Sequence, residues 1–190
     1  MLKLYTKFKL LRISFIMMVI QIVVLLAIIL MTIHASSLTQ ADIEESEVVM
    51  LYDDMGYIPR CVFTLGFYRE TLVANERWGG DSVAIQPLTE SNLSTAFNSD
   101  RLVYIAGHGA EGFILLIDGD IYWPKDIQRK ELGDKLQYIY ISCCDSGILH
   151  DEWQNSLEPA EVKTFDRLSL VIEHAYWLIV DGPKIINELE

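Results

Sequence analysis

An uncharged stretch of 21 residues near the N-terminus constrains this 190-residue chain more than any other feature. It runs from Ile13 to Ile33, ISFIMMVIQIVVLLAIILMTI, and its polar side chains are Ser14, Gln21 and Thr32. A helix rises 1.5 Å per residue, so this stretch reaches across the roughly 30 Å hydrocarbon core of a bilayer. No amphipathic period marks it as the core helix of a soluble domain. The sequence therefore predicts a transmembrane helix over residues 13–33.

Charges on the two sides of this stretch predict its orientation. Residues 1–12 carry four basic side chains, whereas the next Lys or Arg is Arg60. Positive charge stays on the cytoplasmic side, so we expect a cytoplasmic N-terminus and an extracytoplasmic domain. Ala35-Ser36-Ser37 has the small residues of a cleavage site, but a signal peptide's apolar core has only about 7–15 residues. We therefore expect an uncleaved signal anchor, with a cleaved signal peptide as the alternative.

The remainder of the chain is strongly acidic. The net charge is −12, and the first 36 residues hold four basic and no acidic side chains, which leaves −16 on the rest. Such a domain repels phosphates, so a nucleic-acid partner is not expected. The odd number of cysteines, three, does not make a disulfide framework, and no cofactor is expected.

After a predicted polar linker at 34–47, strand-like and helix-like segments alternate through a domain at 48–190. Strands are predicted at 48–52, 82–88, 101–107, 136–142 and 161–165, and helices at 59–76, 93–97 and 167–180. Two further strands, 113–117 and 121–123, flank Asp118-Gly119-Asp120 as a hairpin. Gly182-Pro183 is expected to end the last helix. Strands that are apolar on both faces and separated by helices predict an α/β fold, a mostly parallel sheet covered by helices on both faces.

Reactive side chains follow two of these strands. His108 comes directly after 101–107, and Cys143 and Cys144 come directly after 136–142. Ligands meet the carboxyl ends of strands in open parallel sheets, so we expect a thiol and an imidazole at one edge. A histidine that deprotonates a thiol makes a nucleophile that attacks carbonyl groups. The backbone N–H groups of Gly109 and Cys144 are the predicted donors to the resulting oxyanion.

The order of the two motifs, AGHGA at 106–110 and then CDSG at 144–147, resembles that of the caspase-like cysteine peptidases. This superfamily includes caspases, metacaspases, legumain, gingipains, separase and CHAT domains. The resemblance covers roughly residues 48–182. It implies a caspase-like fold, His108 as catalytic histidine, Cys144 as nucleophile, and a protein or peptide substrate.

Strand alternation separates the two adjacent cysteines. Successive side chains of a strand point to opposite faces, so Cys143 continues the face of Ile139 and Ile141. Cys143 is therefore expected to be a buried, inert thiol. Cys144 lies one step further, where Asp145-Ser146-Gly147 turns the chain, and is expected to face the crevice.

Three alternatives remain at this point. One is a disulfide between Cys61 and either of the adjacent cysteines, which would silence the thiolate. Another is a catalytically inactive binding or sensory module tethered to the membrane, because only PKIINELE follows the last helix, where caspase-type sheets continue to a sixth strand and pocket-forming loops. The third is a metal site, but adjacent cysteines rarely ligate one ion and the chain has no C-x-x-C pair. Its candidate ligands are Cys143, Cys144, Asp145, His150 and Glu152.

The acidic surface suggests a substrate class. Asp145 and Ser146, next to the nucleophile, are predicted to contribute to a substrate pocket. Asp145 favours a basic residue before the cleaved bond, and further carboxylates that could line such a pocket are Asp118, Asp120 and Asp134.

Overall fold

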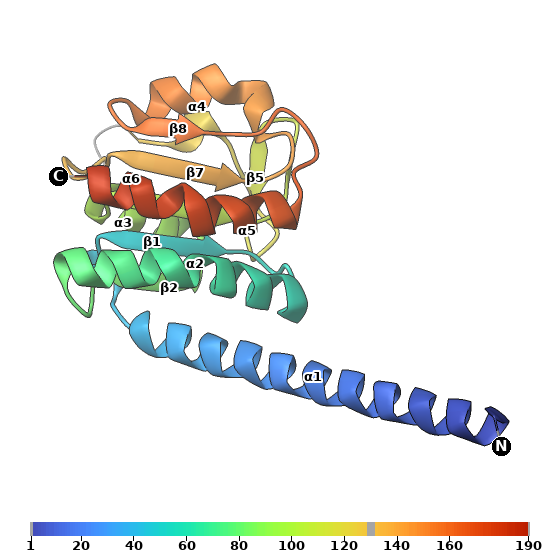
Figure 1. Cartoon of the computed structure of the whole chain (residues 1–190). Coiled ribbons are helices and arrows are strands. Elements are labelled where there is room, and N and C mark those ends of the chain that lie inside the picture. The colour runs from blue at the N-terminus through green and yellow to red at the C-terminus, as the bar shows by residue number, and fades with distance from the viewer. Residues whose placement is uncertain (1, 129–131, 190) are drawn as a thin grey trace.

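The computed structural model describes residues 2–128 and 132–189, which form an α/β domain preceded by one long helix, α1 (Leu2–Leu38). Figure 1 shows α1 beside the domain at its C-terminal end, with its N-terminal end projecting away. The predicted segment 13–33 lies within α1, and most of its large apolar side chains are exposed. The segment from Arg12 to Leu38 is thus long and apolar enough to cross a membrane. The side chains of Lys3, Lys7 and Lys9 lie outside the described part of the chain.

The domain is built on five parallel strands in the order β2-β1-β3-β7-β8. Their bounds are β1 (Val48–Tyr52), β2 (Val83–Pro87), β3 (Leu102–Ala106), β7 (Tyr138–Ser142) and β8 (Glu161–Lys163). β3 and β7 are direct neighbours, with Ala106 opposite Ser142 at their carboxyl ends. The predicted parallel sheet is therefore confirmed.

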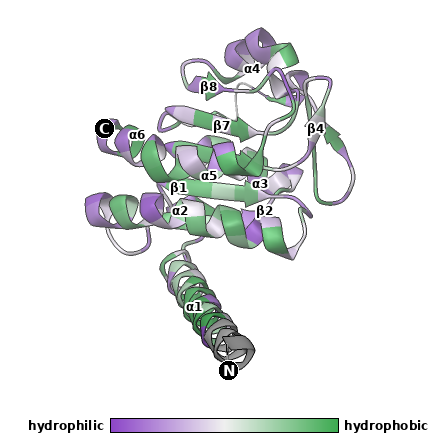
Figure 2. Ribbon diagram, turned by 45° about the vertical axis from the view of Figure 1, so that its right-hand side comes forward, coloured by the Kyte–Doolittle hydropathy of each residue, from purple (hydrophilic) through white to green (hydrophobic). Residues whose placement is uncertain are grey.

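Helices cover both faces of this sheet, as predicted. One face carries α3 (Glu90–Ser99) and α4 (His150–Leu157), and the other carries α2 (Tyr57–Trp78), α5 (Val171–Val180) and α6 (Gly182–Glu188). Alternate residues of each strand enter the two cores. In β3, for example, Val103 packs on the α3 side and Tyr104 on the α2 side. Figure 2 shows the central strand β1 largely in the hydrophobic colour. Helices cover both faces of the sheet, which explains why its central strands lack a polar face.

A small antiparallel sheet lies between β3 and β7 in the chain. It consists of β4 (Gly109–Ala110), β5 (Phe113–Leu115) and β6 (Ile121–Tyr122). The hairpin around Asp118-Gly119-Asp120 is confirmed, whereas β4, which follows His108, was not predicted. Short 3₁₀ helices complete the described structure: η1 (Ile43–Glu45), η2 (Pro124–Asp126) and η4 (Ser146–Leu149).

The segment 34–47 differs from the predicted linker. α1 continues to Leu38, Gln40 pairs with Ala84 of β2, and Ala41 and Ile43 are buried. The His34 ring also hydrogen-bonds the Tyr68 hydroxyl of α2 at 2.8 Å. The apolar side chains within this acidic stretch pack on the domain, and this packing fixes the position of the segment.

The C-terminal helices also differ from the prediction. The helix predicted from residue 167 begins at Val171, because the Glu173 carboxylate accepts the Leu170 N–H at 3.1 Å and pairs with the Arg167 guanidinium at 2.7 Å. α5 ends at Val180, just before Gly182-Pro183, as predicted, and these two residues begin α6, which was not predicted. Proline lacks an N–H and suits a first helical turn, where that donor would have no partner.

Candidate active site

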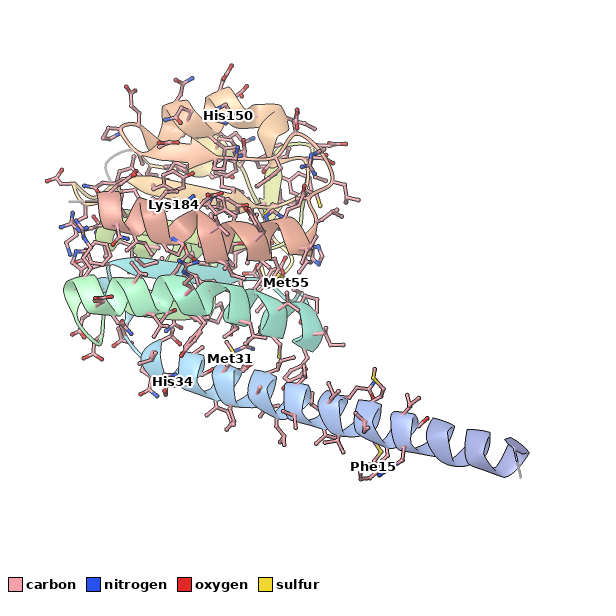
Figure 3. All side chains as sticks on the ribbon, viewed as in Figure 1. Phe15, Met31, His34, Met55, His150 and Lys184 are labelled. Carbon is pink, nitrogen blue, oxygen red and sulfur yellow. The ribbon has the colours of Figure 1, made fainter. Side chains whose placement is uncertain are left out.

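The two neighbouring strands bring His108 and Cys144 to the same edge of the sheet. Each residue lies two positions beyond the paired residues Ala106 and Ser142. Both line one pocket of about 270 Å³, together with Met55 from the loop after β1 and Ser169 from the loop before α5. Figure 3 labels Met55 close to the first turn of α2. Residues 36 positions apart in the sequence therefore share one cavity.

The two adjacent cysteines have different surroundings. Cys143 is fully buried in the same core as Ile139 and Ile141. Burial raises the pKa of the Cys143 thiol well above its ordinary value, and the nearby Asp53 charge raises it further. Cys144 is half-buried, lines the pocket, and has its Sγ 3.6 Å from Ser169 Oγ. The structure thus places the two thiols as strand alternation predicts.

The loop that carries His108 is held by Asp53, which follows β1. The His108 side chain is exposed, while its backbone N–H donates to Asp53 Oδ2. The Asp53 N–H donates to Ala106 O at 3.1 Å, so Asp53 is hydrogen-bonded both to the end of β3 and to the loop that follows it. Burial raises the pKa of Asp53, and the hydrogen bond from His108 opposes that shift.

Gly109 lies where the backbone of this loop approaches the cysteines. A Cβ at this position would lie 2.5 Å from Phe113 O and 2.9 Å from Cys143 Cβ, so no side chain fits. The Leu115 N–H donates to His108 O, and Gly109 lies opposite Ile114 as the next, non-hydrogen-bonded pair of the β4–β5 ladder. Pairs alternate along an antiparallel ladder, so the Gly109 N–H points away from β5. This orientation suits an oxyanion donor.

The residues after Cys144 hold the cysteine loop to the segment before α5. Ser146 is fully buried; its hydroxyl donates to Cys143 O at 2.9 Å and accepts the Phe165 N–H at 3.2 Å. A Cβ on Gly147 would lie 2.6 Å from the Asp166 nitrogen, so this close approach requires glycine. Asp145 adopts the left-handed conformation, with φ of 56°. Neither Asp145 nor Ser146 is among the residues that line the pocket, contrary to the prediction. Both residues instead form the turn that follows Cys144.

Among the polar residues of this site, Asp53, Ser142, Ser169 and His174 were not predicted. Asp53 had an available signal, because it directly follows an apolar strand. The chain crosses from β1 to β2 on one side and then to β3 on the other, so the carboxyl ends of β1 and β3 flank the topological switch point. Ser169 and His174 had no such signal, because they follow no strand and reach the pocket only through the packing of α5.

The residues considered for a metal site do not come together. Among the described residues no group of three or more His, Cys, Asp or Glu side chains is placed to hold an ion. His150, which Figure 3 shows on α4 away from Met55, hydrogen-bonds Thr164 at 2.9 Å. Cys61, Cys143 and Cys144 are all free thiols.

Comparison of the chain with protein-family models, with curated proteins and with solved structures finds no match. The chain is an α/β domain in which a cysteine and a histidine line one cavity at the carboxyl edge of a parallel sheet.

Proposed function

We propose that this protein is a membrane-anchored, caspase-like cysteine endopeptidase that uses His108 and Cys144 as its catalytic dyad. One observation carries the proposal: the two side chains line a single pocket at the carboxyl ends of the neighbouring strands β3 and β7. The inert surroundings of Cys143 and the outward N–H of Gly109 support it.

The chemistry would proceed through a thioester. His108 takes the proton of the Cys144 thiol, and the sulfur attacks the carbonyl carbon of the scissile peptide bond. The carbonyl oxygen becomes an oxyanion and accepts hydrogen bonds from the Gly109 and Cys144 N–H groups. When this intermediate collapses, the C–N bond breaks and His108 returns the proton to the leaving amine. A water molecule then hydrolyses the thioester, with His108 as its base, and restores the free thiol.

The helix α1 would anchor this peptidase as a single-pass membrane protein. Exposed apolar side chains such as Leu30, at 65%, and Ile33, at 60%, suit a lipid environment better than water. The basic N-terminal residues favour a cytoplasmic N-terminus and an extracytoplasmic domain.

One observation favours a catalytically inactive binding or sensory module instead. The described partner of the Cys144 thiol is Ser169, and among the described residues the His108 ring makes no hydrogen bond. Catalytic hydrogen bonds are often long before substrate binds, so we prefer the peptidase.

Active-site labelling distinguishes the two functions. The full-length protein in mild detergent is treated with a pool of peptidyl acyloxymethyl ketones, and the modified residue is mapped by mass spectrometry. A peptidase is expected to be labelled at Cys144 and to lose that label in the His108→Ala variant. Cys61→Ala serves as the matched control and should label normally. A folded protein in which no probe modifies Cys144 would rule out the peptidase.

A further inference from the structure

The pocket beside Cys144 has apolar walls and no fixed charge of the kind a basic substrate needs. Its walls include Met55, Pro59, Phe63, Leu168 and Val171. Neither a carboxylate nor a Lys or Arg is among its described lining residues. Asp118, Asp120 and Asp134, considered above for basic substrates, are exposed residues outside it. Asp53 lies behind Gly107 of the pocket wall: a Cβ on Gly107 would be 3.0 Å from Asp53 Oδ2.

A buried histidine is among the residues that line this pocket. His174 of α5 is 2% exposed, lines the cavity, and has its Nδ1 2.9 Å from the Tyr140 hydroxyl. The rings of Phe63 and Phe165 pack against it, with centroids 6.0 and 4.8 Å away. Its Nε2 is buried and has no hydrogen-bond partner among the described residues. His174 thus has one ring nitrogen that contacts Tyr140 and one that has no partner among the described residues.

The Tyr140 contact determines which tautomer His174 adopts. Burial lowers the pKa of His174 to about 4, so the ring is neutral at physiological pH. The hydroxyl proton of Tyr140 has His174 Nδ1 as its described partner, and a buried hydroxyl proton is rarely left unpaired. Tyr140 therefore donates to Nδ1, and Nε2 carries the hydrogen. The pocket lining thus includes a histidine whose uncharged Nε2–H lacks an acceptor among the described residues.

We propose that this pocket receives the side chain preceding the scissile bond, and that His174 selects an uncharged side chain with an apolar stem and a terminal hydrogen-bond acceptor. Glutamine fits best, since its carbonyl can accept from His174 Nε2 while its amide meets the hydroxyl of Ser142, another residue of the pocket lining. The carboxylate of a substrate glutamate would find no Lys or Arg among the described lining residues, and the guanidinium of a substrate arginine would find no carboxylate there. Burying either charge without a partner is costly. This inference rests on the proposed function.

The test uses four acyloxymethyl ketones that differ only in the residue before the reactive group: glutamine, norleucine, glutamate and arginine. The rate of Cys144 labelling is measured for each. Glutamine is expected to react at least tenfold faster than norleucine, because a site built for a hydrogen bond discriminates against a partner that lacks it. Glutamate and arginine should be slower than glutamine by a similar factor or more.

Variants of His174 separate its role from general stability. His174→Phe keeps the ring packing and removes the N–H, so the glutamine rate should fall to the norleucine rate while the norleucine rate changes less than about twofold. His174→Gln offers an amide N–H near the Nε2 position and should recover part of the preference. If arginine is the fastest probe, the inference is overturned and Asp53 becomes the selecting residue, but the peptidase stands. If no probe labels Cys144 in the folded protein, the peptidase fails and this inference with it.

Discussion

At the scale of single residues, buried carboxyl groups are the most consequential feature of this acidic chain. Asp53, Glu70 and Asp100 are all buried, and burial raises the pKa of each. Asp100 is held by the Ser46 hydroxyl, and its pKa is raised to about 8, mainly by desolvation. The fold therefore keeps at least one carboxyl protonated well above the range in which an exposed aspartate ionises.

Asp100 makes stability depend on pH. Its pKa is about 8 in the folded state and near 3.8 when unfolded, so the folded state binds the extra proton between these values. The stability that Asp100 contributes to the folded state is fully present below pH 3.8 and is lost as the pH rises through 8. In urea unfolding, the wild type should lose at least about 1 kcal/mol more stability between pH 5 and 8.5 than Asp100→Asn, which cannot ionise. Parallel losses in the two proteins would refute this assignment.

Gly109 offers a second prediction at the same scale. A methyl group there would meet Phe113 O and Cys143 Cβ, so Gly109→Ala should destabilise the protein by about 1–3 kcal/mol and slow Cys144 labelling at least tenfold. Gly80→Ala is the matched control, because no atom lies within 4 Å of its added Cβ, and should change stability by less than about 0.5 kcal/mol. A Gly109→Ala protein that labels normally would mean that this close approach is not needed.

At the scale of elements, the strands were predictable and several helix ends were not. β1, β3 and β7 are apolar on both faces because both faces are covered, and this leaves a clear pattern in the sequence. β4 has only two residues, too few for any period. The start of α5 depends on the hydrogen bond and ion pair of Glu173, and the order of segment 39–47 depends on tertiary packing. Local patterns carry little information about either.

The hairpin that carries Gly109 is held from α4 by Trp153. This side chain is fully buried, and its Nε1–H donates to Gly112 O at 2.9 Å. Trp153→Phe removes that donor and leaves a small cavity, so it should destabilise the protein by about 2–4 kcal/mol. The half-exposed Trp78 gives a control, because Trp78→Phe should cost less than about 1 kcal/mol. Chemical denaturation of both variants measures the difference, and equal effects would show that Trp153 does not brace the hairpin.

At the scale of the whole molecule, α1 gives the chain an apolar surface that the domain does not cover. Its outward side chains would associate or aggregate in water, whereas a bilayer would bury them. The acidic domain, with its charge of −16, would stay in the aqueous phase beside the membrane. The placement of His108 and Cys144 at one edge of the sheet could also be predicted, because each residue follows a strand and the two strands are parallel. The neutral pocket could not, because it depends on how α5 packs.

Membrane anchoring predicts that the full-length protein stays in the pellet when membranes are washed with alkaline carbonate. Protease added from the extracytoplasmic side should digest the domain, while protease confined to the cytoplasm should not. A soluble mature protein that begins near Ala35 would instead identify residues 13–33 as part of a cleaved signal peptide.

The central claim is that His108 activates Cys144, and differential alkylation tests it most directly. The folded protein is treated with iodoacetamide at pH 6.5, where an ordinary thiol is only about 1% thiolate, and the modification of each cysteine is followed by peptide mass spectrometry. We expect Cys144 to react at least tenfold faster than Cys61, Cys143 to remain unmodified, and His108→Ala to reduce the Cys144 rate to that of Cys61. Equal rates for Cys144 and Cys61, an unchanged rate in His108→Ala, or first modification at Cys143 would contradict the account.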